Sequence, residues 1–159
     1  MKSIRTILNP LRTIILPNNY YSNKHVLVTG GGSGLGRQMA YTYSSLGAEV
    51  SIVGRKIEKL EETKNVIEKL TENKVNCYSL DVRKFELVNA LAFDMEENNN
   101  LPNIIINNAA GNILSPIKNL SPNAINSVID IVLKGTINTT LAFGKQLIKS
   151  DIPGSIINI

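Results

Sequence analysis

The sequence predicts an α/β fold in which a parallel sheet lies between two layers of helices. Short apolar runs alternate along the chain with longer stretches whose apolar residues recur at helical spacing. The first apolar run is followed by a glycine-rich turn and then by one of these helical stretches. Strands that alternate with helices require parallel pairing with right-handed crossovers. We therefore expect a doubly wound, three-layer α/β/α domain.

Nine elements follow from these patterns. They are expected at residues 25–29 (strand), 34–46 (helix), 49–53 (strand), 57–70 (helix), 75–80 (strand), 83–97 (helix), 103–107 (strand), 122–150 (helix) and 154–159 (strand). In a Rossmann-type sheet such strands take the order 3-2-1-4-5, and the ligand binds where the order reverses, between the first and fourth strands. We expect residues 25–159 to form this domain.

Local residues support several of these boundaries. Gly47 follows the first helix, where a C-terminal glycine is common. Residues 104–106 are three isoleucines, which indicates a strand buried on both faces. Ser121 and Pro122 predict the start of the last helix, with proline at its first position. The charged residues opposite the apolar face of the second helix indicate a solvated surface.

Charge and composition exclude several classes of function. The net charge is +4, but residues 1–24 hold Lys2, Arg5, Arg12 and Lys24 and no acidic residue, so the remainder is neutral. This argues against a general nucleic-acid-binding surface. No apolar run approaches the ~20 residues that span a bilayer. With one cysteine and one histidine, the chain offers neither an internal disulfide nor a metal-ligand cluster.

The N-terminal segment has the character of a mitochondrial transit peptide. Its first 16 residues are basic, rich in hydroxyl groups and free of acids, and their apolar residues recur at helical spacing. We expect residues 1–24 to be a transit segment and arm that directs the protein to the mitochondrial matrix. The alternative is a plain disordered or surface-packed arm, because Pro10 weakens a helix there.

Residues 29–36 predict an anion-binding turn. Glycines let the backbone approach a ligand closely, and the helix that follows presents free N–H groups and the positive end of its dipole. The candidate residues of this turn are Gly30, Gly31, Gly32, Ser33, Gly34, Leu35 and Gly36.

Two motifs together resemble the short-chain dehydrogenase/reductase family. One is the spacing of Gly30, Gly34 and Gly36 after Thr29, and the other is Asn-Asn-Ala-Ala-Gly at residues 107–111. The resemblance implies that the glycine turn holds the pyrophosphate of a dinucleotide cofactor. It places Asn107 and Ala109 near the adenosine ribose and Asp81 at the adenine edge. Asp81 reads equally well as the N-cap of the following helix, and either asparagine alone reads as a strand-end turn former.

The residues after the second strand favour NADPH over NADH. An acidic residue there would bind the ribose 2′-hydroxyl of NADH, but this chain has Arg55 and Lys56. Arg55 can bind a 2′-phosphate through a charge-assisted fork. The alternative is a solvated charge at a helix start, where the helix dipole disfavours it.

Further runs resemble the mitochondrial 2,4-dienoyl-CoA reductases within this family, at residues 102–112, 120–124, 130–133 and 144–149. This implies NADPH-dependent reduction of 2,4-dienoyl-CoA thioesters in the auxiliary β-oxidation of unsaturated fatty acids, by enzymes that are homo-oligomers at full length. The implied acyl-CoA contacts are Arg83, Ile113 and Ser121. Ile113 replaces an aromatic residue of the family, and Ser121 reads equally well as a helix cap.

Two departures bear on catalysis. Lys134 stands where the resemblance implies a helix asparagine that supports a proton path. A buried ammonium there is costly without a partner. Alternatively, Lys134 points outward and the geometry of the proton path is lost. The implied catalytic serine, tyrosine and lysine lie beyond the fifth strand, so no catalytic residue is assigned and we expect a C-terminally truncated fragment. The alternatives are a non-catalytic NADPH-binding or interaction protein and an enzyme of the same family with another substrate.

Overall fold

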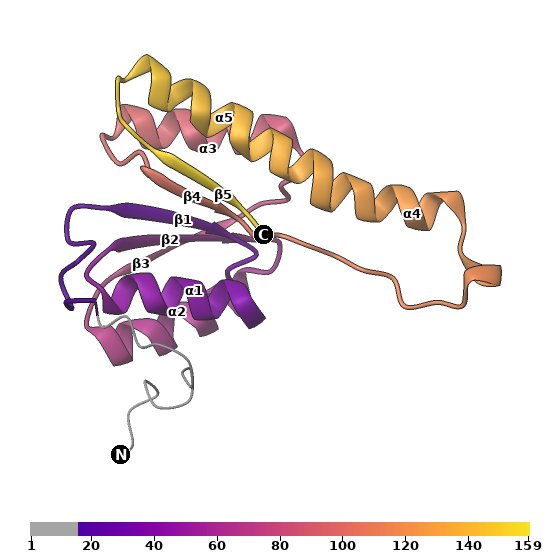
Figure 1. Ribbon diagram of the computed structural model, residues 1–159, viewed down its shortest axis with the longest axis horizontal. Helices are drawn as coiled ribbons and strands as arrows, with labels where there is room; N and C mark the ends of the chain where they lie inside the picture. The colour runs from indigo at the N-terminus through magenta and orange to yellow at the C-terminus, as the bar shows by residue number, and fades with distance from the viewer. Residues whose placement is uncertain (1–15) are drawn as a thin grey trace.

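The computed structural model describes residues 16–159. Among these residues one parallel sheet has the strand order β3-β2-β1-β4-β5, which confirms the predicted order. Figure 1 shows α1 and α2 on one face of the sheet and α3 and α5 on the other. The strands are β1 (His25–Thr29), β2 (Glu49–Gly54), β3 (Val75–Ser79), β4 (Ile104–Asn107) and β5 (Ser155–Asn158). The first three helices are α1 (Gly34–Ser45), α2 (Ile57–Thr71) and α3 (Phe85–Glu97).

Strand β1 lies in the middle of the sheet and is buried along its whole length. Because successive side chains of a strand point to opposite faces, Val26 and Val28 join the apolar cluster under α1 and α2. Leu27 joins the cluster under α3 and α5, which includes Phe143. The core therefore has two halves, and the carboxyl end of β1 is held rigidly between them.

Residues 16–24 lead into β1 and lie against the end of α1. The N–H of Tyr21 donates to the carbonyl of Leu46 at 2.9 Å, and the Tyr21 ring meets the Tyr43 ring edge-on at 5.0 Å between centroids. Gly47 has a φ of +91°, as a C-terminal glycine should. The amphipathic pattern of the expected transit segment falls on residues 1–15, which lie outside the described residues.

The expected single helix over residues 122–150 is wrong in one respect. It consists of α4 (Pro122–Ile129), a π-helical turn η3 (Asp130–Lys134) and α5 (Gly135–Lys149). The N–H of Gly135 donates to the carbonyl of Asp130, five residues back, and this bond defines the π turn. The apolar spacing predicts a continuous helix and does not distinguish one π turn from the α-helical turns around it. In Figure 1, α4 projects beyond the sheet.

The N-cap expectation for Asp81 is also wrong, because α3 begins only at Phe85 and has Lys84 as its N-cap. The Asp81 carboxylate instead accepts a hydrogen bond from the Arg83 N–H at 3.0 Å, and the Lys84 N–H donates to the Asp81 carbonyl at 2.9 Å. An aspartate that binds the backbone two residues on forms a turn. Residues 81–84 therefore turn the chain before the helix starts.

At the far side of the sheet, β5 forms an edge, and all four of its residues are exposed. No helix in residues 16–159 is long and apolar enough to cross a membrane.

Candidate nucleotide-binding site

A cavity of about 260 Å³ lies at the carboxyl ends of the central strands. Its walls come from the segments that follow β1, β2, β3 and β4, and from the π turn. This is the point where the strand order reverses, at which doubly wound sheets bind ligands. Six of the predicted cofactor residues line the cavity: Gly30, Gly32, Ser33, Arg55, Asp81 and Ala109.

The glycine turn is fixed to the end of β2. The N–H groups of Gly30 and Gly31 both donate to the Val53 carbonyl, at 2.8 and 3.2 Å. A side chain on Gly31 would lie 2.6 Å from the Ile52 side chain, so this position faces the core rather than the cavity. A side chain on Gly36 would collide with the Gly30 carbonyl. These two glycines shape the turn, and the cavity lies on its other side.

The start of α1 offers backbone donors to an anion. Ser33 precedes the helix in an extended conformation and makes no side-chain capping bond, and the first turn holds no acidic residue. The N–H groups of a helix's first turn have no partner within the helix and carry the positive end of its dipole. Gly34 and Leu35 begin this turn without lining the cavity, and the Leu35 side chain is exposed. The arrangement suits a phosphate placed beside Ser33.

Polar bonds link the ends of β1 and β4 beside the cavity. The Thr29 hydroxyl accepts hydrogen bonds from the N–H groups of Asn108 and Ala109, at 3.0 and 2.9 Å. The Asn108 side chain donates to the Thr29 carbonyl at 3.0 Å. Asn107 is buried, and its amide nitrogen donates to Asn158 at 2.9 Å and to Thr140 at 3.2 Å. Both asparagines therefore hold the strand ends in place. Of the two predicted cofactor residues here, Asn107 and Ala109, only Ala109 lines the cavity.

The cavity wall is cationic on the side of β2 and α2. Arg55, Lys56 and Lys59 all line it. The sequence predicted a role for Arg55 and Lys56 but not for Lys59. Lys59 lies three positions after Lys56, and this helical spacing could have indicated that both face the same site. The stem of Lys59 packs on the glycine turn, since a side-chain carbon on Gly32 would lie 3.2 Å from its Cβ. Three cations beside free N–H groups favour a ligand with more than one phosphate.

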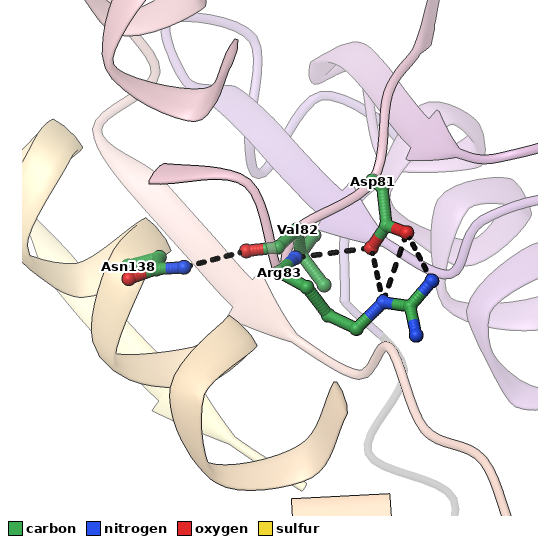
Figure 2. A network of polar contacts seen from close by, with 4 residues as sticks. All are labelled: Asp81, Val82, Arg83 and Asn138. Carbon is green, nitrogen blue, oxygen red and sulfur yellow. Dashed lines mark hydrogen bonds and ion pairs between the residues drawn. The ribbon is translucent and has the colours of Figure 1, made fainter. Parts of the chain in front are cut away.

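Asp81 is the one acidic residue among those that line the cavity, and Arg83 neutralises it. Figure 2 shows the Arg83 guanidinium facing the Asp81 carboxylate. Its Nε donates to Oδ1 at 3.0 Å and to Oδ2 at 2.9 Å, and its Nη2 donates to Oδ2 at 2.5 Å. The hydrogen bonds from Arg83 hold the pKa of Asp81 below its usual value. The carboxylate stays ionised, and Arg83 contributes more to this than the more weakly acting charge of Arg55.

Comparison with known proteins identifies the family. A model of the short chain dehydrogenases matches residues 24–159. The chain belongs to the short-chain dehydrogenase family. A Caenorhabditis elegans relative named "Probable 2,4-dienoyl-CoA reductase 3" is 41% identical over 147 residues, which are 91% of this chain and 47% of that protein. A peroxisomal 2,4-dienoyl-CoA reductase from Danio rerio is 33% identical and covers 92% of this chain and 49% of its own length.

Solved structures of short-chain dehydrogenases agree with the fold. One from Bacillus anthracis is 43% identical with a TM-score of 0.78, and the match covers 85% of this chain and 56% of that one. An Escherichia coli protein in complex with NADPH is 28% identical with a TM-score of 0.80, over 89% of this chain and 60% of that one. The chain spans about half the length of the curated relatives it matches.

The predicted acyl-CoA residues of this short-chain dehydrogenase are not gathered in the cavity. Arg83 is occupied by Asp81, and Ile113 is half exposed in the loop before η2 (Ile117–Asn119). The Ser121 hydroxyl accepts from the Ala124 N–H at 3.2 Å, which confirms its helix-capping role. Lys134 points outward and pairs with Asp130 at 2.6 Å, so its ammonium is not buried.

One further residue that shapes the site was missed. Arg37 follows the glycine turn, and its Nη2 donates to the Gly32 carbonyl at 3.1 Å and to Glu62 at 3.0 Å. Its Nε donates to the Thr63 hydroxyl at 2.9 Å. Arg37 therefore ties the glycine turn to α2. The available signal was a basic residue directly after the turn, opposite a helix rich in glutamate.

Proposed function

We propose that this chain forms the NADPH-binding part of an oxidoreductase that reduces 2,4-dienoyl-CoA thioesters. The observation that carries the cofactor assignment is the cavity wall: a glycine turn at a helix N-terminus faces Arg55, Lys56 and Lys59. A 2′-phosphate adds negative charge to an adenosine ribose, so this wall discriminates between NADPH and NADH. The solved Escherichia coli relative with NADPH supports the same assignment.

Each group in the cavity has a role in holding the nucleotide. The N–H groups at the start of α1 bind the pyrophosphate, because they are free donors at a positive helix end. Arg55 binds the 2′-phosphate in a fork, and Lys56 and Lys59 add unspecific attraction. Leu80 and Val82 present an apolar surface to the adenine ring beside Asp81. NADPH would supply the hydride, and these residues would hold its adenosine and pyrophosphate half.

The cofactor assignment is tested by titration of the chain with NADPH and NADH, followed by nicotinamide fluorescence. A charge-assisted hydrogen bond contributes about 1.5–3 kcal/mol, so we expect NADPH to bind roughly ten- to a hundredfold more tightly. The variant Arg55→Glu should reverse this preference. Lys69→Glu, on the exposed face at the other end of α2, is the matched charge control and should leave it unchanged. Equal affinity of the wild type for both nucleotides would contradict the assignment.

The substrate assignment follows from the relatives named 2,4-dienoyl-CoA reductases and is tested separately. In the presence of NADP⁺, a 2,4-dienoyl-CoA should bind more tightly than the saturated acyl-CoA of equal length.

We propose that Arg83 exchanges Asp81 for a phosphate of CoA, because a guanidinium binds both anions in the same fork. Arg83→Ala should then weaken CoA binding, and an unchanged affinity would refute this role.

We also propose that residues 1–24 direct the protein to mitochondria. The Danio rerio relative is named peroxisomal, so the compartment needs a direct measurement. A fusion of residues 1–24 to a fluorescent reporter should enter the mitochondrial matrix, and a reporter that stays in the cytosol or enters peroxisomes would refute the proposal.

A further inference from the structure

Two residues of α5 hold the turn between β3 and α3. Gly135 and Asn138 are three positions apart, so they share one face of the helix. Figure 2 shows Asn138 reaching from α5 toward Val82, which lies between Asp81 and Arg83 in that turn. The Asn138 amide nitrogen donates to the Val82 carbonyl at 2.9 Å.

Val82 is a wall of the cavity and also part of the core. Its side chain is 7% exposed and belongs to the apolar cluster under α3 and α5. The side chain lies against Gly135, where any side-chain carbon would come within 2.6 Å of Val82 Cγ2. Val82 is therefore held twice by α5, through its side chain at Gly135 and through its carbonyl at Asn138.

The same helical segment provides a second wall. Ile131, in the π turn, lines the cavity directly. A side-chain carbon on Gly111 would lie 2.8 Å from Ile131 Cδ1, so Ile131 packs closely on the segment after β4. Ile131, Gly135 and Asn138 follow one another at spacings of four and three residues, and each contacts the cavity or Val82. This side of the helical segment therefore faces the site.

We propose that Asn138 is a positioning residue for the adenine end of the nucleotide. It acts through Val82: its amide fixes the carbonyl of the residue whose side chain forms the apolar wall next to Asp81. The inference rests on the proposed nucleotide function and adds a residue outside the cavity. A part-buried carbonyl needs a donor, and a loop held at one backbone atom keeps its side chain in place without an ordering cost when the ligand binds.

The test compares the two halves of the cofactor on the full chain. Calorimetry gives Kd for 2′,5′-ADP, which carries the adenine end, and for reduced nicotinamide mononucleotide, which lacks it. Asn138→Ala should weaken 2′,5′-ADP binding about three- to tenfold, as expected for one net hydrogen bond, and leave the mononucleotide unchanged. Asn65→Ala, an exposed asparagine on α2, is the control and should change neither.

A second variant separates hydrogen bonding from packing. Asn138→Asp keeps the side-chain volume but points an oxygen at the Val82 carbonyl, so it should weaken 2′,5′-ADP binding at least as much as Asn138→Ala. If Asn138 served packing alone, the aspartate variant would bind better than the alanine variant. That order, or equal loss of both ligand halves, would overturn the proposal.

A third measurement needs no variant and so does not depend on the variants' folding. In wild-type protein, 2′,5′-ADP should slow amide hydrogen exchange in residues 80–84 and in the first two turns of α5 together. Slowed exchange in residues 80–84 alone would overturn the coupling. A wild type that binds neither 2′,5′-ADP nor NADPH would instead refute the proposed cofactor, so the two failures are distinguishable.

Discussion

Replacement of Gly36 by alanine should destabilise the domain although alanine is the better helix former. A Cβ at this position would lie 2.7 Å from the Asn108 amide nitrogen and 2.8 Å from the Gly30 carbonyl carbon. Neither neighbour is free to move, because the Gly30 N–H donates to Val53 and the Asn108 side chain donates to Thr29. The collision must therefore push α1 away from the turn.

The magnitude follows from two opposing contributions. Overpacking of a fixed site costs about 1–3 kcal/mol, and contacts with backbone atoms place this substitution at about 3 kcal/mol. Alanine recovers up to about 1 kcal/mol relative to glycine in a helix. We expect a net loss of about 2 kcal/mol in the free energy of unfolding, which lowers Tm by roughly 4–8 °C in a domain of this size.

Urea unfolding followed by far-UV circular dichroism measures this loss. Gly34→Ala is the matched control, because Gly34 has a φ of +53° and a Cβ there would meet nothing within 4 Å. Its cost is conformational only, about 1 kcal/mol. If Gly36→Ala unfolded at the wild-type urea concentration, or lost less than Gly34→Ala, the steric argument would be refuted.

Three further predictions concern single residues. Thr29→Val leaves the N–H groups of Asn108 and Ala109 without their acceptor, and at about 1–3 kcal/mol for each unsatisfied donor urea unfolding should show a loss of at least about 2 kcal/mol; a wild-type midpoint would contradict this. Burial lowers the pKa of His25 below 6.5, so the unfolded chain takes up the proton first, and the free energy of unfolding should fall as pH drops below about 6.5. In His25→Gln this free energy should change less between pH 7 and 5. Equal changes in the variant and the wild type would disprove the assignment. Arg83 lowers the pKa of Asp81 below 3.8, so the stabilisation by this pair is present above about pH 4 and is lost as pH falls through the lowered pKa; carboxyl NMR should show a higher Asp81 pKa in Arg83→Ala, and an unchanged value would contradict the pairing.

The sheet was predictable because each strand can be recognised from its own residues and those that flank it. The apolar runs before Thr29 and Asn107 are short and end in turn residues, so their length and flanks separate them from helices. The cap at Ser121 and the glycine at position 47 have fixed positional preferences. Alternation of strands and helices then leaves one common strand order.

Features that depend on partners distant in the sequence were not predictable. The π turn ends at Gly135, which packs on Val82, 53 positions away in the chain, and the apolar spacing of the helix indicates neither the turn nor this contact. Asn138 reads as an ordinary polar residue on a helix. Asp81 matches a helix cap by its place, but Arg83 competes for its carboxylate. The preferences of residues for strand ends, helix caps and turns were therefore enough to locate the cavity. The role of each residue that lines it depends on tertiary contacts.

The central place of β1 also determines the time course of its burial during synthesis. One edge of β1 pairs with β2, which follows closely, but the other must wait for the segment around Asn103, 78 residues after His25. At about 5–20 residues per second, ribosomes need roughly 4–16 s to add that segment. For this interval an apolar strand has an open edge, which is a template for aggregation. Residues 25–29 are thus a segment that a chaperone would protect in the nascent chain.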